Sequence, residues 1–283
     1  MSEQITVLGS TGFIGSRVQT RLLELGYDPF CPGRDERLTS QRLGTVVYCV
    51  GLTADFREDP LGSYNAHLGL LRQLLVENSV ERVVYLSSAR VYLPLLDAQS
   101  DLARLTEDLP IPVLSSSSSD VYTLSKLAGE SLVLATGPAN TALRLSNVVG
   151  PPAEMGSFLG QVVAEIKSTG QLHLRSHPQS AKDYISVGAV VETITMTLRR
   201  RMPGVYNVCN GFNLSNQDWL DLLAQHFAFE LQVDDTCRPV VYPPISHTLL
   251  TAQTGFVPET RDAVFAALEL HGSSRPCDQE GGK

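Results

Sequence analysis

The first half of the chain alternates two patterns of apolar residues. Short apolar runs, such as Ile5 to Leu8, are typical of strands buried on both faces of a parallel sheet. Between them, apolar positions recur every three or four residues, as they do from Ile14 until Gly26 ends the pattern, and this spacing predicts helices. The predicted strands are 5–8, 28–31, 46–50, 82–87, 141–145 and 204–208, and the predicted helices are 14–25, 62–77 and 121–135.

Strands and helices that alternate in this way pack as a parallel sheet with helices on both faces. The sequence therefore predicts an α/β fold built on a doubly wound parallel sheet. The pattern changes after Gly150, and residues 151–271 are expected to form mainly a smaller lobe over the strand ends. Within that range we expect helices near 158–168, 187–199 and 217–227 and a short strand at 172–174.

The turn between the first strand and the first helix carries three glycines. Glycine at 9, 12 and 15 allows the backbone to turn tightly, to approach a pyrophosphate and to pack the helix closely on the sheet. The helix N-terminus adds unpaired N–H groups and positive potential, so a phosphate can bind without a lysine. We therefore expect residues 1–150, with the return strand at 204–208, to form a dinucleotide-binding Rossmann domain. The expected cofactor-binding residues of this turn are Gly9, Thr11, Gly12, Phe13, Ile14 and Gly15. An ordinary strand-to-helix turn is the alternative, because the spacing differs from G-x-G-x-x-G.

Tyr122 and Lys126 lie four residues apart in the helix predicted at 121–135 and therefore share a face. A neighbouring ammonium group favours the phenolate, so it lowers the pKa of a tyrosine from its usual value of about 10. A phenol tuned in this way can exchange a proton with a substrate oxygen at neutral pH. We expect both residues to be catalytic. A surface tyrosine stacked on a lysine stem is the structural alternative.

Serines occupy two informative positions. Ser87 and Ser88 end the strand predicted at 82–87, at the edge where doubly wound sheets bind ligands, and a hydroxyl there can hydrogen-bond a substrate carbonyl. Two serines after a strand also make an ordinary turn. The serine run at 115–119 has the composition of a linker, but its position directly before the Tyr122 helix favours a mobile flap over the site.

Composition narrows the class of protein. A chain of 283 residues with 43% hydrophobic content can bury a large core, and a net charge of -8 argues against nucleic acid as a partner. The five cysteines show no C-x-x-C spacing, which is typical of reduced core residues, and no metal site is expected. No signal peptide and no run of about 18 apolar residues is found, so we expect a cytoplasmic protein without membrane contact. The polar residues 272–283 predict a disordered tail.

Several further segments fall into a recognisable order. They are Tyr64-Asn65-Ala66-His67-Leu68, Leu86 to Tyr92, Thr106-Glu107-Asp108, Leu143 to Pro151, Lys182 to Val187 and Gly204 to Val208. Together with the glycine turn and Tyr122 to Lys126, this set resembles the extended short-chain dehydrogenases/reductases over about residues 5 to 230. The similarity is to the branch of nucleotide-sugar epimerases and dehydratases.

The resemblance implies roles for the central residues. Tyr122 is the proton donor or acceptor, and Lys126 lowers its pKa and holds the nicotinamide ribose. Ser88, rather than Ser87, is the hydroxyl partner and contacts the substrate.

The resemblance also implies residues around the substrate. Asn65 supports the sheet from the next helix, and Asn147 binds substrate where the chain passes into the lobe. Lys182 stands where an arginine usually grips a sugar-nucleotide diphosphate, and lysine keeps the charge without the bidentate fork. A solvated Lys182, and cap or turn roles for the two asparagines, remain open.

The sequence departs from the family pattern in two places. Only about a dozen residues separate the second predicted strand from Val46, where the family has another strand and helix, so the adenine pocket should be more open. Ala89 and Arg90 follow Ser88 in place of the Asp-Glu pair of the 4,6-dehydratases, which argues against that chemistry.

The residues after the second predicted strand bear on the choice of cofactor. An acidic residue there accepts the ribose hydroxyls of NAD, whereas an arginine accommodates the 2′-phosphate of NADP. Counting favours Asp35, but Gly33 marks the end of the strand and Arg34 follows it directly. We therefore expect NADP(H), with NAD possible and a solvated Arg34 as the alternative.

These observations lead to one main hypothesis. We expect an oxidoreductase, an NADPH-dependent ketoreductase acting on a nucleotide-linked keto-deoxysugar. An epimerase with retained NAD and a non-catalytic nucleotide-binding protein are the alternatives. The helices at 62–77 and 121–135 carry apolar stripes, and the matching helices of the family pair in a homodimer, although burial within one subunit gives the same stripes.

Overall fold

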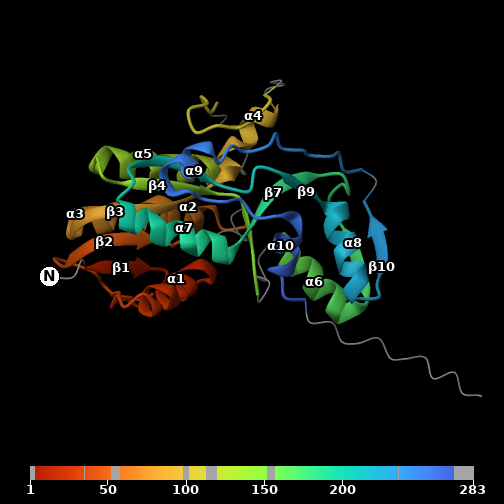
Figure 1. The fold of residues 1–283 in the computed structure, drawn as a ribbon, viewed down its shortest axis with the longest axis horizontal. Coiled ribbons are helices and arrows are strands. Elements are labelled where there is room, and N and C mark those ends of the chain that lie inside the picture. The colour runs from red at the N-terminus through yellow and green to blue at the C-terminus, as the bar shows by residue number, and fades with distance from the viewer. Residues whose placement is uncertain are drawn as a thin grey trace, which may run out of the picture.

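A five-stranded parallel sheet forms the centre of one part of the molecule (Figure 1). Its strand order is β1-β2-β3-β4-β8, which confirms the predicted α/β fold class with a doubly wound sheet. The strands are β1 (Ile5–Leu8), β2 (Arg42–Tyr48), β3 (Ser79–Ser88), β4 (Thr141–Leu145) and β8 (Gly204–Val208). This computed structural model describes residues 4–34, 36–51, 58–97, 102–112, 120–151, 157–234 and 236–270. Asp35, the serine run at 115–119 and the tail at 272–283 lie outside the described residues.

The sheet reverses its strand order at β1. Phe30 pairs with Thr6 on one edge of β1 through a single parallel bridge, while β2 pairs along the other edge. The strand predicted at 28–31 is therefore reduced to this bridge, and no strand lies beyond it in the part of the chain that the structure describes. Ligands of doubly wound sheets bind at such a reversal, next to the carboxyl end of the strand.

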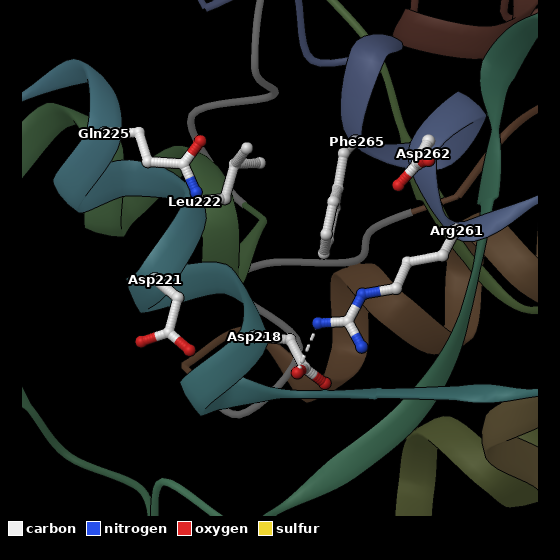
Figure 2. Close-up of a pocket in the computed structure, with 7 residues that line it drawn as sticks. All are labelled: Asp218, Asp221, Leu222, Gln225, Arg261, Asp262 and Phe265. Carbon is white, nitrogen blue, oxygen red and sulfur yellow. Dashed lines mark hydrogen bonds and ion pairs between the residues drawn. The ribbon is translucent and has the colours of Figure 1, made fainter.

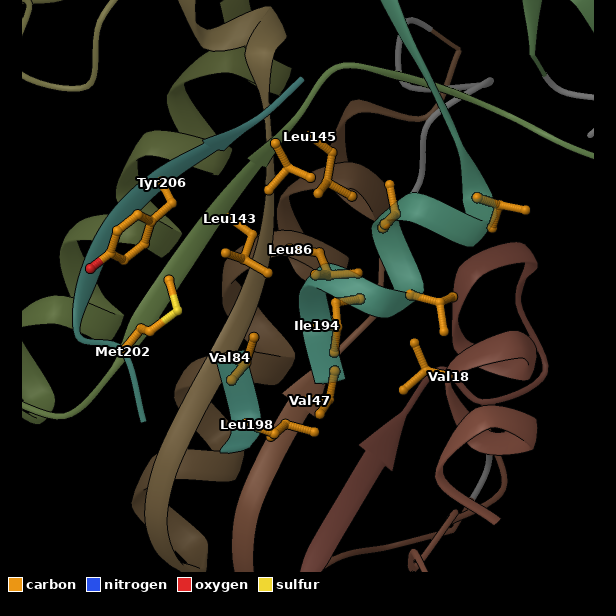
Figure 3. Close-up of a cluster of buried hydrophobic side chains, with 14 of the residues drawn as sticks. Val18, Val47, Val84, Leu86, Leu143, Leu145, Ile194, Leu198, Met202 and Tyr206 are labelled. Carbon is orange, nitrogen blue, oxygen red and sulfur yellow. The ribbon is translucent and has the colours of Figure 1, made fainter. Parts of the chain in front are cut away.

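Helices cover both faces of the sheet. Alternate residues of β2 point to opposite sides, so that Val47 joins the core with α1 (Phe13–Glu24) and α7 (Val187–Arg200). Val46 joins the core with α3 (Leu70–Glu77) and α5 (Asp120–Thr136). Figure 3 shows Ile194 and Leu198 of α7 against this sheet. The helix expected at 187–199 thus lies within the range assigned mainly to the lobe, but it packs on the sheet.

The helix predicted at 62–77 is interrupted. It consists of α2 (Pro60–Tyr64), a π-helical turn (Asn65–Gly69) and α3. Two tyrosines of the sheet donate hydrogen bonds to carbonyl oxygens of this turn, Tyr48 to Ala66 at 2.7 Å and Tyr85 to His67 at 3.1 Å. The sheet therefore supplies hydrogen bonds where regular helical bonding is interrupted, and π-helical turns of this kind are frequent at functional sites.

The remaining elements form a smaller lobe beside the sheet, at the right of Figure 1. A three-stranded sheet in the order β5-β7-β9 adjoins the parallel sheet, and β6 pairs with β10. The strands are β5 (Asn147–Val149), β6 (Gln171–Leu174), β7 (Ala181–Ser186), β9 (Asn213–Ser215) and β10 (Glu230–Val233). The helices of this lobe are α6 (Phe158–Thr169), α8 (Asn216–His226) and α10 (Arg261–Ala266), while α9 (Thr248–Thr254) returns to the parallel sheet and α4 (Leu93–Asp97) follows a 3₁₀ turn at Ala89–Tyr92.

Candidate active site

The glycine turn follows β1 at the point where the strand order reverses. Gly9 has a φ of +76°, a region that favours glycine, and a Cβ there would lie 3.0 Å from the carbonyl carbon of Cys49. A Cβ on Gly15 would overlap the carbonyl oxygen of Gly9. Gly12 begins α1, and no side chain of the described residues caps its first turn. The turn is therefore tightly packed against the next strand and leaves the first N–H groups of α1 for a ligand.

The other predicted residues of this turn differ in burial. Thr11 is exposed, whereas Phe13 and Ile14 are half-buried and pack against the sheet core. The guanidinium of Arg17 lies 4.5 Å from the ring centroid of Phe13 and donates a hydrogen bond to its carbonyl oxygen at 2.6 Å. Phe13 and Ile14 thus use their side chains in packing, whereas the side chain of Thr11 is exposed.

The two serines at the end of β3 have different partners. Ser87 is buried and donates a hydrogen bond to Oε1 of Glu130 at 2.5 Å. Ser88 is half-buried, and its Oγ accepts a hydrogen bond from the backbone N–H of Arg90 at 3.2 Å. The hydroxyl proton of Ser87 is committed to the carboxylate, whereas Ser88 uses an acceptor lone pair in this contact.

Tyr122 and Lys126 lie one turn apart on α5, and both are buried, with exposed fractions of 5% and 4%. Nζ of Lys126 donates a hydrogen bond to the carbonyl oxygen of Leu86 at 2.9 Å. Burial lowers the pKa of Lys126 to about 7, and the carboxylate of Glu130 opposes this shift. The guanidinium of Arg90 lies 5.9 Å from the ring centroid of Tyr122. The structure therefore brings Tyr122 and Lys126 beside the strand end that carries Ser88.

The segment after β2 joins the glycine turn to this cluster. Gly9 approaches Cys49, as described above, and a Cβ placed on Gly51 would lie 3.6 Å from Nζ of Lys126. Residues 49–51 thus run between the glycine turn on one side and Lys126 on the other. Both predicted halves of the site lie at the carboxyl edge of the parallel sheet, at the ends of β1 and β3, which flank β2.

A buried ion pair lies next to this cluster, and its carboxylate, Glu130, accepts the hydrogen bond from Ser87. Arg144 of β4 donates hydrogen bonds from Nε and Nη2 to the carboxylate of Glu130, the latter at 2.8 Å, and both side chains are almost fully buried. Nη1 of Arg144 also donates to the hydroxyl of Tyr92 at 2.9 Å. The pairing raises the pKa of Arg144 although burial opposes it, so Arg144 stays charged and balances Glu130. No sequence pattern indicates this pair, because its members lie on different elements.

His67 is a further residue of the cluster that the sequence did not indicate. It lies in the π-helical turn with no exposed surface, and its ring meets the ring of Tyr122 edge-on, with 5.0 Å between centroids. Burial and the charge of Lys126 lower the pKa of His67 to about 2, so the imidazole is neutral. A histidine inside an apolar helical pattern is typical of a core residue, which is why the sequence did not point to it.

The predicted substrate residues lie on the small sheet of the lobe. Asn147 begins β5, and its amide donates a hydrogen bond to the carbonyl oxygen of Asp183 at 2.8 Å. Lys182 lies in β7 and is half-buried. Burial raises the pKa of the neighbouring Asp183 to about 6, although it accepts hydrogen bonds from the backbone N–H groups of Asn210 and Gly211. Asn147 and Lys182 thus share one sheet with Asp183.

Arg34, the predicted cofactor residue, follows the segment that pairs with β1. It is exposed in a turn that Gly33 and Glu36 close by a backbone hydrogen bond of 3.2 Å. Asp35, the acidic alternative, lies outside the described residues.

A hollow of about 350 Å³ lies elsewhere, between α8 and α10 of the lobe (Figure 2). Arg261 bridges it by an ion pair of 2.5 Å with Asp218 and stacks over Phe265. Asp221, Leu222, Gln225 and Asp262 complete the lining. None of the predicted site residues lies there.

The described residues fit a nicotinamide dinucleotide. A Cβ on Gly9 or Gly15 would crowd the cradle beside α1, and a buried lysine stands at the neighbouring strand ends. Nε2 of His67 is buried and has no hydrogen-bond partner among the described residues, so the cluster retains an unused acceptor. Among the same residues, no group of three or more His, Cys, Asp or Glu side chains could hold a metal ion. No described helix is long and apolar enough to span a bilayer.

A doubly wound sheet with a glycine turn and a serine, tyrosine and lysine at adjacent strand ends defines the class of NAD(P)-dependent short-chain dehydrogenases/reductases. The sequence model of the NAD dependent epimerase/dehydratase family matches residues 5–209, and the chain belongs to this family. It is an NAD(P)-dependent enzyme of the oxidoreductase and epimerase type, and the resemblance seen in its motifs is confirmed.

Individual proteins resemble this chain over most of its length. A GDP-6-deoxy-D-mannose reductase from Pseudomonas aeruginosa is 26% identical over 262 residues, which cover 82% of this chain and 83% of the relative. RMD from Pseudomonas aeruginosa complexed with NADPH superposes with a TM-score of 0.75 at 23% identity, covering 94% of this chain and 97% of that one. MoeE5 in complex with UDP-glucose and NAD gives a TM-score of 0.75 at 21% identity, with the same two shares. The two structures show that the fold is shared.

Proposed function

We propose that this protein is an NADPH-dependent ketoreductase that acts on a nucleotide-linked keto-deoxysugar. The observation that carries the proposal is that the two serines at the end of β3 have different hydrogen-bond partners. Ser87 is held by Glu130, while Ser88 accepts one hydrogen bond and keeps its proton for a substrate oxygen. A donor beside Tyr122 and Lys126 is what the reduction of a carbonyl group requires.

In this proposal the residues of the chain bind the carbonyl oxygen and supply the proton that it gains. Ser88 donates a hydrogen bond to the carbonyl oxygen, and Tyr122 transfers its hydroxyl proton to that oxygen as negative charge develops there. The bound nicotinamide supplies the hydride that the carbonyl carbon gains. Lys126, one helical turn away, stabilises the phenolate that remains on Tyr122. With the hydride from bound NADPH and the proton from Tyr122, the ketone would become an alcohol.

The carboxylates around the described part of the site support a reductase over a dehydratase. Removal of water needs an acid and a base in addition to the tyrosine, but the residues after Ser88 are the buried Ala89 and the half-buried Arg90. Glu130, the carboxylate that acts on Lys126, is paired with Arg144. It therefore has no freedom to exchange protons with a substrate.

The choice of NADPH rests on Arg34. Its exposed side chain follows the segment that pairs with β1, where the ribose of the adenosine is expected, and a guanidinium suits a 2′-phosphate. RMD, which shares the fold, has been obtained complexed with NADPH.

The substrate class rests on the lobe and on the relative. Asn147 and Lys182 lie on the β5-β7 sheet, and an ammonium group there suits the diphosphate of a sugar nucleotide. The relative at 26% identity is a GDP-6-deoxy-D-mannose reductase. We therefore place a nucleotide-linked deoxysugar between the strand ends and the lobe.

The test is a two-way assay of the purified protein. We expect NADPH, in preference to NADH, to be consumed with one member of a panel of nucleotide-linked keto sugars. In the reverse direction, we expect NADP⁺ to be reduced with the matching deoxysugar, GDP-6-deoxy-D-mannose being the first to try. Tyr122→Phe should lower kcat by about 10²- to 10⁴-fold and leave the Kd for NADPH unchanged. Tyr64→Phe, on the exposed end of α2, is the matched control and should retain full activity.

Other outcomes would contradict the proposal. Tightly bound NAD, with conversion of one sugar epimer into another and no net use of NADPH, would identify an epimerase. An unchanged rate in Tyr122→Phe would refute the role given to the tyrosine. Binding of nucleotides without turnover of any keto sugar would favour a non-catalytic protein.

A further inference from the structure

His67 has one ring nitrogen in use and one without a partner. Nδ1 lies 2.8 Å from Oγ of Ser125, and the hydroxyl of Ser125 donates its single proton to the carbonyl oxygen of Tyr122 at 3.0 Å. Nδ1 must therefore carry the ring proton and donate it to Ser125. Nε2 is left as a lone-pair acceptor, fully buried and without a hydrogen-bond partner among the described residues. An acceptor in this state is costly unless a ligand or water satisfies it.

Nε2 of His67 and Nζ of Lys126 both lie close to Gly51. A Cβ placed on Gly51 would lie 3.7 Å from Nε2 of His67 and 3.6 Å from Nζ of Lys126. One point is thus near an acceptor and a donor at once. Gly51 itself is exposed, whereas Nε2 of His67 is buried behind it.

The chemistry of the two nitrogens selects the group that fits between them. The imidazole is neutral because burial and Lys126 lower its pKa to about 2, so it can only accept at Nε2. The amine of Lys126 uses one proton for Leu86 and has others to donate. A hydroxyl group is the simplest partner, because its oxygen accepts from Lys126 while its proton goes to His67. A carbonyl or phosphate oxygen would satisfy Lys126 but leave His67 unpaired.

We infer that His67 is a cofactor-binding residue, whose Nε2 accepts a hydrogen bond from a hydroxyl of the ribose next to the nicotinamide. The inference rests on the proposed function in needing a nicotinamide dinucleotide in this site. It also adds a second contact to the ring of Tyr122, since the same imidazole packs edge-on against it. An ordered water would offer the same hydroxyl chemistry, and the experiment separates the two sources.

Two substitutions dissect the imidazole. In His67→Asn the amide nitrogen can replace the donor at Nδ1 and keep the bond to Ser125, but the acceptor at Nε2 is lost. In His67→Gln the side-chain oxygen reaches the position of Nε2 and restores the acceptor. Gly51→Ala provides an independent test, because its methyl group makes only ordinary contacts with the protein yet occupies the point where the hydroxyl is expected. His226→Asn, at the exposed end of α8, is the control.

The readout is the Kd of each variant for two ligands, measured by calorimetry together with a thermal unfolding curve. NADPH contains the nicotinamide ribose, and adenosine 2′,5′-bisphosphate lacks it. We expect His67→Asn and Gly51→Ala to weaken NADPH binding about 5- to 10-fold, and His67→Gln and His226→Asn to bind within about twofold of the parent. Binding of adenosine 2′,5′-bisphosphate should be the same in all.

Three results would overturn the inference. Equal losses for both ligands would mean that His67 acts through the fold of the site. Unchanged NADPH binding in His67→Asn and Gly51→Ala would mean that water satisfies Nε2. If the parent protein binds neither NADPH nor NADH, the proposed function fails together with the inference, whereas in the first two cases it stands.

Discussion

Lys126 donates a hydrogen bond from its buried Nζ to the carbonyl oxygen of Leu86. Leu86 lies two residues before Ser88 in β3, so this bond ties the helix that carries Tyr122 to the strand end that carries the proposed substrate donor. The lysine therefore fixes the spacing between the two elements in addition to supplying charge. A residue with a different length or donor geometry, arginine included, cannot do both.

The two serines of β3 should respond differently to removal of the hydroxyl. Ser88→Ala should lower kcat/KM by about 10²-fold, because a hydrogen bond to the developing negative charge is lost, and should leave stability unchanged. Ser87→Ala should keep kcat and lower the free energy of unfolding by about 1.5–3 kcal/mol, since Ser87 donates to a buried carboxylate. Steady-state kinetics and urea unfolding check both. A larger kinetic loss in Ser87→Ala than in Ser88→Ala would reverse the assignment.

Burial of Lys126 should make stability depend on pH in a defined window. Its pKa is about 7 in the folded protein and 10.5 for an ordinary lysine, as in the unfolded chain, so between these values the unfolded chain binds more protons than the folded one. The free energy of unfolding attributable to this residue therefore rises with pH from 7 to 10.5, and its cost is greatest below pH 7. Lys126→Met should be most stabilised relative to the parent near pH 6, and the difference should shrink toward pH 9.

Urea unfolding of the cofactor-free protein at four pH values measures this difference. Lys167→Met, on the exposed side of α6, is the control and should show a constant difference from the parent. A pH-independent difference for Lys126→Met would show that the amine is not desolvated as described.

The ion pair between Glu130 and Arg144 should be costly to break from one side. Glu130→Gln leaves the guanidinium of Arg144 buried without a countercharge and should lower the free energy of unfolding by about 3–5 kcal/mol. The double variant Glu130→Gln with Arg144→Met removes both charges and should lose less than the sum of the two single variants. Chemical unfolding of the four proteins closes the cycle, and strict additivity would argue against a coupled pair.

The outer side of α2, α3 and α5 should hold two subunits together. Leu61 is 81% exposed and Val76 69% exposed on α2 and α3, and Leu134 is 37% exposed on α5, which packs beside α2. Exposed apolar side chains on neighbouring helices suit a second copy of this chain. Leu61→Glu should weaken self-association at least about tenfold in light scattering. Leu249→Glu, at a leucine that is 49% exposed on α9, should not, and a parent that is monomeric at all concentrations would contradict the expectation.

Hydrophobic periodicity predicted the strands and helices of the first half closely. It did not predict every strand pairing, or which surface each helix packs against. β1, β4 and β8 have the predicted bounds. The segment around Phe30 forms a single bridge, because Pro29 and Pro32 on either side have no backbone N–H to donate to a longer ladder. The stripe on α7 predicted a helix, but a stripe does not say which surface it buries.

The parts of the candidate site that could be predicted from the sequence are those whose residues have a characteristic spacing. The glycines of the turn and the pair Tyr122 and Lys126 have such spacing, and the structure places them at the carboxyl edge of the parallel sheet, while their roles stay predictions. His67 has no such signature, since a π-helical turn changes which way its side chain faces relative to a regular helix. The partnership of Glu130 and Arg144 depends on packing between a helix and a strand, which no local pattern encodes.

The course of the chain between its two parts limits how the molecule can be divided. After β4 the chain passes through β5 and α6, returns as α7 and β8, and departs again through β9 and α8 (Figure 1). A fragment ending near residue 150 would lack one strand of the parallel sheet and the helix that covers one of its faces, and would present that apolar face to water. Several chain crossings connect the lobe to the parallel sheet. We therefore expect the lobe to move by small sliding displacements and not by rotation about a single hinge. Truncation therefore cannot yield a stable piece that binds the dinucleotide without the lobe.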